Sequence, residues 1–260
     1  MKSPFTIESD PFTALETDEL GDVFALEEIE APTSLPQPVF RFDCAAGCLP
    51  VATANCRRVL RQAMVDAIAL CSRAAGLLEA SPPSATTRSI FRSFFGHDPS
   101  RPVPWAGNKA SGAIVAHRLR KTAEAFHRRV IHVRCGGFPG APAGQQCGGA
   151  NAFVIPSRHP NVIFLCPPFW NLAASVPSVP PITAAGRARV ARFWRAGILL
   201  HEMLHLLYRP FFRHQSNPPH ADDPQERRRD NSHCYEAFVL KVTGHRPDPA
   251  DLTQCRDNPV

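Results

Sequence analysis

The sequence predicts an α+β fold that is predominantly helical and contains one small β-sheet. Three stretches, at about 49–79, 108–130 and 185–208, repeat apolar residues every three or four positions, which is the period of an amphipathic helix. Between the second and third stretches lie short apolar runs at 131–135, 152–156 and 162–166, which have the length of strands. The 27 prolines favour short elements joined by stiff loops. The small sheet is therefore expected beside the third long helix.

The first 40 residues are expected to form a leader or prosegment that is disordered. Residues 1–35 contain nine of the 23 acidic residues and a single basic residue, Lys2, and prolines punctuate the stretch 31–38. An acidic segment with few apolar residues cannot bury enough surface to fold alone. The rest of the predicted organisation is one domain over 41–245 and an irregular, proline-rich tail over 246–260.

The helices that precede the sheet follow from their apolar stripes and their ends. The first is expected to begin near 49–53 and to end at Glu79, because Ser81-Pro82-Pro83-Ser84 follows. A short helix over 85–95 turns its phenylalanines inward and is stopped by Gly96. A third is expected over about 108–130.

The region after residue 130 changes to strand patterns and then returns to helix. Residues 131–135 alternate as a strand does, and proline follows each of the two later apolar runs. Cys135 and Cys147 flank a glycine-rich loop and are expected to close it with a disulfide. One helix over about 185–208 and another over about 231–242 complete the domain.

The helix over 185–208 contains His201-Glu202-Met203-Leu204-His205, an H-E-x-x-H motif. Two histidines four residues apart share one helical face, so both imidazoles can bind the same metal ion. Burying them with a glutamate among leucines is costly unless a cation compensates them. The motif therefore predicts a zinc site in which Glu202 acts as general base on a water molecule.

A zinc site in a hydrolase usually needs a third protein ligand, which must come from beyond this helix. The metzincin continuation is absent, because Tyr208 and Phe211 stand where it needs glycine and histidine. His233 is the preferred candidate, since a helix is a stiffer platform than a loop. The side chain of Cys234 is expected to point about 100° away from it. The other candidates are His214, His220, Asp222, Asp223, Asp230 and Glu236.

From Cys44 to Leu240 the chain resembles the deuterolysin or aspzincin metallopeptidases, which include the peptidyl-lysine metalloendopeptidases. The matching pieces occur in the family's order: a cysteine-flanked long helix, an aromatic segment at 91–96, the loop between Cys135 and Cys147, the runs 152–156 and 163–169, the H-E-x-x-H helix, and Asn231-Ser232-His233-Cys234-Tyr235-Glu236. His233 aligns with an aspartate of the family segment N-A-D-S-Y-E-x-F. The resemblance implies a zincin-like fold and His233 as the third ligand. The family's G-T-x-D-x-x-Y-G motif is not recognisable between His205 and His233, so lysine specificity is not implied.

Together these inferences predict a zinc-dependent endopeptidase that acts on a protein or peptide. One Zn²⁺ ion is expected on His201, His205 and His233, with Glu202 as general base and then general acid. The substrate is expected to lie extended along a strand within 152–166. The alternative is a catalytically degenerate zincin-like protein that keeps the metal for a binding or structural role.

Charge and cysteine content bound the partners and the compartment. The net charge is +6, but 25 of the 29 basic residues are arginines scattered along the chain, so no nucleic-acid partner is expected. No stretch approaches the roughly 20 apolar residues of a membrane span, so no membrane partner is expected either. Nine cysteines favour disulfides and an oxidising compartment, whereas no secretory signal is recognisable. Secretion by a non-classical route and a cytoplasmic location both stay open.

Overall fold

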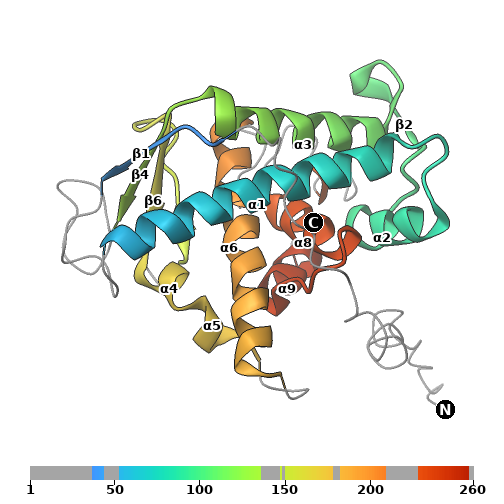
Figure 1. The fold of residues 1–260 in the computed structure, drawn as a ribbon. Coiled ribbons are helices and arrows are strands. Elements are labelled where there is room, and N and C mark those ends of the chain that lie inside the picture. The colour runs from blue at the N-terminus through green and yellow to red at the C-terminus, as the bar shows by residue number, and fades with distance from the viewer. Residues whose placement is uncertain are drawn as a thin grey trace, which may run out of the picture. The chain divides into compact units, whose positions relative to one another are not determined.

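The structure is a computed structural model that describes residues 37–43, 53–135, 147, 150–177, 182–208 and 228–257. These residues are mostly helical and include a small mixed sheet, which confirms the α+β class (Figure 1). In chain order the elements are β1 (Phe40–Asp43), α1 (Thr53–Glu79), α2 (Ala85–Phe95), β2 (Pro102–Val103), the 3-10 helix η3 (Pro104–Ala106), β3 (Lys109–Ala110), α3 (Ser111–Arg128), β4 (Ile131–Cys135), β5 (Ala152–Phe153), β6 (Val162–Leu165), α4 (Pro167–Trp170), α5 (Leu172–Ser175), α6 (Ala184–Leu207), α8 (Ser232–Val242) and α9 (Pro249–Asp257).

The ends of the helices follow from capping residues in the sequence. The hydroxyl of Ser84 accepts a hydrogen bond from the backbone N–H of Thr87 at 3.0 Å, and α2 ends at Gly96, whose φ is 76°. Thr183 caps α6 in the same way, accepting from the N–H of Gly186 at 3.1 Å. These local signals are the reason that the predicted bounds of both helices agree with the structure to within a residue at their N-termini.

The main sheet has the strand order β1-β4-β6-β5. β1, β4 and β6 are parallel, and β5 is antiparallel to β6, so β5 is an edge strand of this sheet among the residues described. α6 packs against β5 as well as against α1, α3, α5 and α8. The predicted place of the sheet beside α6 is therefore confirmed.

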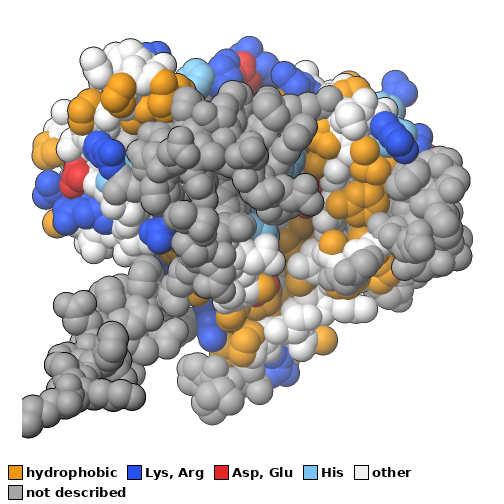
Figure 2. Space-filling model, turned by 180° about the vertical axis from the view of Figure 1, so that it is seen from behind, with side chains coloured by type: hydrophobic (Ala, Val, Ile, Leu, Met, Phe, Trp, Pro, Cys, Tyr) orange, Lys and Arg blue, Asp and Glu red, His pale blue; other side chains and the backbone are white. Residues whose placement is uncertain are grey.

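The core gathers around the C-terminal half of α6. Residues 196–204 of this helix are all buried, on every side of the helix, because α1, α3 and α8 surround it. Figure 1 shows α1 crossing in front of α6, with α8 and α9 beside it. None of the helices in the described ranges is both long and apolar enough to cross a membrane. On the face shown in Figure 2, the Lys and Arg side chains of the described surface are scattered.

The C-terminal tail is more regular than the sequence predicts. The tail was expected to be irregular from residue 246, but it contains the helix α9 over Pro249–Asp257. The prolines there start a helix instead of preventing one: Asp248 accepts from the N–H of Ala250 at 2.9 Å, and Pro249 occupies the first turn. A disordered leader was predicted over 1–40. Residues 1–36 of it lie outside the described residues, and β1 begins at Phe40.

The disulfide predicted between Cys135 and Cys147 is wrong in its pairing. Cys147 is bonded to Cys166, with the Cα atoms 5.8 Å apart, and Cys135 is bonded to another cysteine. The register of the parallel pair β4–β6 sets Cys135 opposite Leu165, so Cys166 follows directly after the end of that pairing, where Cys147 reaches it. A further disulfide, Cys234–Cys255, joins α8 to α9. The predicted presence of disulfides is thus confirmed.

Candidate metal centre

The two histidines of the H-E-x-x-H motif face each other from one side of α6. Their Nε2 atoms are 3.1 Å apart, and Nδ1 of His201 lies 3.2 Å from Oε2 of Glu236. With its Nδ1–H donating to the carboxyl oxygen, His201 presents the lone pair of Nε2 toward His205. Two nitrogens bound tetrahedrally to one zinc ion at 2.0–2.1 Å would lie about 3.3 Å apart. The spacing of the pair therefore fits a shared cation.

Ser232, the first residue of α8, brings a hydroxyl to the same point. Its Oγ lies 3.0 Å from Nε2 of His201 and 3.1 Å from Nε2 of His205. The side chain of Asn231 caps this helix by accepting from the N–H of His233 at 2.9 Å, which directs the start of α8 at α6. A hydroxyl can donate only one hydrogen bond, so it satisfies one imidazole at a time and offers oxygen lone pairs to a cation. The sequence singled out Ser232 only as part of a motif and did not predict this contact.

His233 and Glu236 lie three residues apart on α8 and both approach His201. One ligand atom from each of His201, His233 and Glu236 lies within 4.8 Å of the others, and all three residues are buried. The rings of His201 and His233 are 4.4 Å apart at 67°. His205 does not belong to this group of three. The structure thus places both predicted partners of His201 beside it, but it does not gather the three histidines into one group.

The other predicted third ligands are engaged elsewhere or lie outside the described residues. Asp230 is buried in an ion pair with Arg118 at 2.9 Å. The sulfur of Cys234 is in the disulfide to Cys255, which agrees with its exclusion as a ligand. The remaining candidates are not among the described residues: His214, His220, Asp222 and Asp223.

The site contains two buried carboxyl groups, those of Glu202 and Glu236, whose pKa values are raised. Burial raises the pKa of Glu202 to about 8. Burial, together with the negative charges of Asp251 and Asp248, holds the pKa of Glu236 well above its usual range. Burial therefore favours the protonated form of both groups in the absence of a cation. A bound cation would favour their ionised forms, so the site is suited to exchanging protons for a metal ion.

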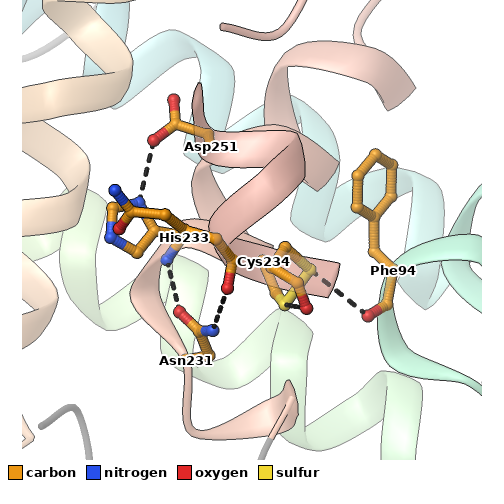
Figure 3. Close-up of a disulfide and its surroundings, with 7 residues drawn as sticks. Phe94, Asn231, His233, Cys234 and Asp251 are labelled. Atoms are coloured by element: carbon orange, nitrogen blue, oxygen red, sulfur yellow. Dashed lines mark hydrogen bonds and ion pairs between the residues drawn. A yellow bond between two sulfur atoms is a disulfide. The ribbon is translucent and has the colours of Figure 1, made fainter. Parts of the chain in front are cut away.

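A hydrogen bond from a helix outside the predicted domain orients His233. Figure 3 shows its ring turned toward Asp251 on α9, and Nδ1 lies 2.8 Å from Oδ1 of that carboxylate. The sequence did not predict this contact, because Asp251 was placed in an irregular tail. The Asp248-Pro249 pair, which is typical of a helix start, and the cysteine at 255 were the signals available.

Arg118 on α3 holds the segment that leads into α8. Its Nη1 donates to the carbonyl of Arg229 at 2.7 Å, to Asp230 at 2.9 Å and to the hydroxyl of Tyr235 at 3.1 Å. Tyr235 is fully buried, so its hydroxyl has a structural role in this network. Tyr208, at the end of α6, lies with its ring 5.6 Å from the same guanidinium, and burial raises its pKa to about 12.

Gly197 makes room for the carboxyl group of Glu236. It lies one turn before His201 on α6, and a Cβ atom there would come within 2.7 Å of Oε1 and 3.1 Å of Cγ of Glu236. Glu236 is buried and is bonded to His201, so it cannot move away without losing that hydrogen bond. The absence of a side chain at position 197 is therefore a requirement of the site.

Gly197→Ala is expected to displace Glu236, to lower the free energy of unfolding by about 1–3 kcal/mol, as overpacking does, and to weaken metal binding. Gly76→Ala is the matched control: Gly76 is exposed on α1 and its nearest neighbour would be 4.0 Å from the new Cβ. That change is expected to stabilise the protein by up to about 1 kcal/mol through helix propensity. Urea unfolding and competition with a chelating dye measure both effects, and equal results for the two variants would contradict the packing argument.

Comparison with models of known protein families matches none of them, and a search of curated proteins also finds no match.

Proposed function

We propose that the chain is a zinc-dependent endopeptidase of the zincin type, with His201, His205 and His233 as ligands and Glu202 as general base. The observation that carries the proposal is the 3.1 Å approach of Nε2 of His201 to Nε2 of His205 while a carboxyl group engages Nδ1 of His201. Such a carboxyl–imidazole pair raises the basicity of the nitrogen that faces the metal. The resemblance to the aspzincins supports the assignment of His233.

A bound zinc ion would supply a Lewis acid that polarises the scissile carbonyl and makes a water molecule more acidic. Glu202, next to His201 on a buried turn of α6, has a pKa of about 8 because of burial. A carboxyl group that titrates near neutrality can take a proton from water and pass it to the leaving amine. Glu202 is therefore the group to which the proposal assigns proton transfer.

The sheet offers a place for an extended peptide. β5 pairs with β6 on one side, lies at an edge of the described sheet, and packs against α6. A peptide can add to such an edge through backbone hydrogen bonds, with alternate side chains entering pockets. The proposed substrate is accordingly an unfolded or extended protein segment.

A metal-binding protein without hydrolytic activity is the second candidate. It is favoured by one observation, that His205 lies outside the group formed by His201, His233 and Glu236. A metal held by that group alone would be bound by His201 but not by His205, the second histidine of the H-E-x-x-H motif. The difference between the two candidates is catalysis, so it is decided by a cleavage assay.

The test is the digestion of a peptide library by the zinc-loaded protein, with and without a chelator, read by mass spectrometry. The proposal expects cleavage that the chelator abolishes and added zinc restores. No cleavage by protein with one zinc per chain would support the second candidate. His233→Ala, measured in parallel, is expected to lose zinc, and unchanged zinc content would refute the assignment of this ligand.

A further inference from the structure

We infer that α9 is part of the metal centre, with Asp251 as the positioning residue that fixes the ring of His233. The inference rests on the proposed zinc site and adds to it a group from the C-terminal region, which the predicted metal site did not include. It follows from three sets of contacts around His233.

The first is the direct contact between Asp251 and His233. Nδ1 of the imidazole lies 2.8 Å from Oδ1 of the carboxylate, and each side chain is 11% exposed. A carboxylate only accepts hydrogen bonds, so in the neutral imidazole Nδ1 carries the proton and Nε2 keeps its lone pair. The contact therefore selects the tautomer of His233 that can bind a metal through Nε2.

The second is the continuation of this hydrogen-bonded chain to His201. Glu236 shares a hydrogen bond with Asp251, and Oε2 of Glu236 lies 3.2 Å from Nδ1 of His201. The order of groups is thus His233, Asp251, Glu236, His201, and the members come from α9, α8 and α6. One pair of carboxyl groups orients two imidazoles on two helices, so displacement of α9 would disturb both rings.

The third is the anchoring of α9 to α8. Cys255 lies four residues after Asp251, on the same face of α9, and is bonded to Cys234, the neighbour of His233. The side-chain amide of Asn231 also donates to the carbonyl of Gln254 at 3.2 Å. Figure 3 shows the disulfide and the Asp251–His233 contact on either side of the start of α8. The disulfide thus holds α9 where its carboxylate reaches the ring.

Asp251→Asn tests the inference, because it keeps the shape and changes the hydrogen bond. An amide can donate to Nδ1, which moves the proton to Nε2 and blocks that nitrogen for metal. Zinc affinity, measured by competition with a chelating dye, is expected to fall by about 10- to 100-fold. In the metal-free protein, histidine-ring ¹⁵N correlation spectra should show His233 shifting from the Nδ1–H tautomer to the Nε2–H tautomer. A change that only loosened the fold would not produce this shift.

Asp248→Asn is the matched control, since it removes a charge from the same region but not a hydrogen bond to His233. Asparagine at position 248 can still accept from the N–H of Ala250, so α9 keeps its cap. The control is expected to leave the tautomer of His233 unchanged. Zinc affinity is not its readout, because the charge of Asp248 also acts on Glu236.

The inference is overturned if the tautomer of His233 stays unchanged in Asp251→Asn or shifts in Asp248→Asn. Where the wild type binds zinc, an unchanged zinc affinity in Asp251→Asn overturns it as well. If Asp251→Asn does not fold, Asp251→Ala removes the acceptor from a helix that tolerates alanine and should give a mixture of tautomers. A double variant, Cys234→Ala with Cys255→Ala, should show the same mixture if the disulfide positions α9. The tautomer is read without metal, so it stays decisive even if the wild type proves to bind no zinc or to cleave no peptide.

Discussion

Glu202→Gln is expected to abolish peptide cleavage while the protein still binds one zinc ion. The substitution keeps the size of the side chain and removes its ability to take a proton. Loss of a positioned general base costs about 10²- to 10⁴-fold in rate. The measurement is kcat/KM on a peptide from the library digest, with zinc content determined on the same sample. Residual activity within tenfold of wild type would refute the role of Glu202.

The same variant should be more stable than the wild type when metal is removed. The folded-state pKa of Glu202 is raised to about 8, so between the unfolded value of about 4.5 and 8 the folded state binds the proton more tightly than the unfolded chain does. Stability of the wild type must then fall as the pH rises through this window. Glutamine does not titrate, so it carries no such cost. The free energy of unfolding of the variant, relative to that of the wild type, should therefore be higher at pH 8 than at pH 5 by on the order of 2–4 kcal/mol.

Glu124→Gln is the control for both measurements. Glu124 is a partly exposed residue of α3 that pairs with the exposed side chains of Lys121 and Arg128. Exposed ion pairs contribute little to stability, so neither the cleavage rate nor the pH dependence of unfolding should change appreciably. An inactive Glu202→Gln protein that is also more stable at pH 8 would separate a catalytic defect from a folding defect.

The long elements could be predicted from the sequence because each carries its own signal. An apolar stripe between a capping residue and a helix-stopping residue defines α2, and the apolar run with H-E-x-x-H defines the buried half of α6. β1 was not predicted, because its four residues alternate over too short a stretch to be told from a loop. α9 was not predicted, because prolines at its start were interpreted as breaking a helix that they begin.

The motif residues of the site could be predicted, but the groups that orient them could not. The face shared by His201 and His205 follows from helical periodicity alone. The contact of Asp251 with His233 depends on how α9 packs against α8, and that of Ser232 with both histidines depends on how α8 meets α6. Such contacts are set by tertiary packing, for which one sequence gives no spacing rule. The same holds for Gly197, because its role depends on the tertiary contact that brings the side chain of Glu236 against it.

The segment that enters α8 is held in place by a residue that is distant in the sequence. Arg118 lies on α3, more than 100 positions before Asp230 in the sequence, yet its guanidinium contacts the backbone and side chains on both sides of Asn231. The side chains of Arg118 and Asp230 are 9% and 3% exposed, so their charges are removed from water together. Asn231 and Ser232 follow directly, which links this ion pair to the start of α8 and to the hydroxyl between the two histidines.

Arg118→Met is therefore expected to lower the free energy of unfolding by about 3–5 kcal/mol, the usual cost of removing one partner of a buried ion pair. Methionine fills much of the volume but leaves the carboxylate of Asp230 without the compensating guanidinium. Urea unfolding should show a lower midpoint with an unchanged slope. Arg118→Met combined with Asp230→Asn removes the charge that the single change leaves uncompensated, and should recover part of the loss. Asp230→Asn is also measured alone. If its effect on the free energy of unfolding is the same in the Arg118→Met background as in the wild type, the two side chains are not coupled, and the network does not support α8 as described.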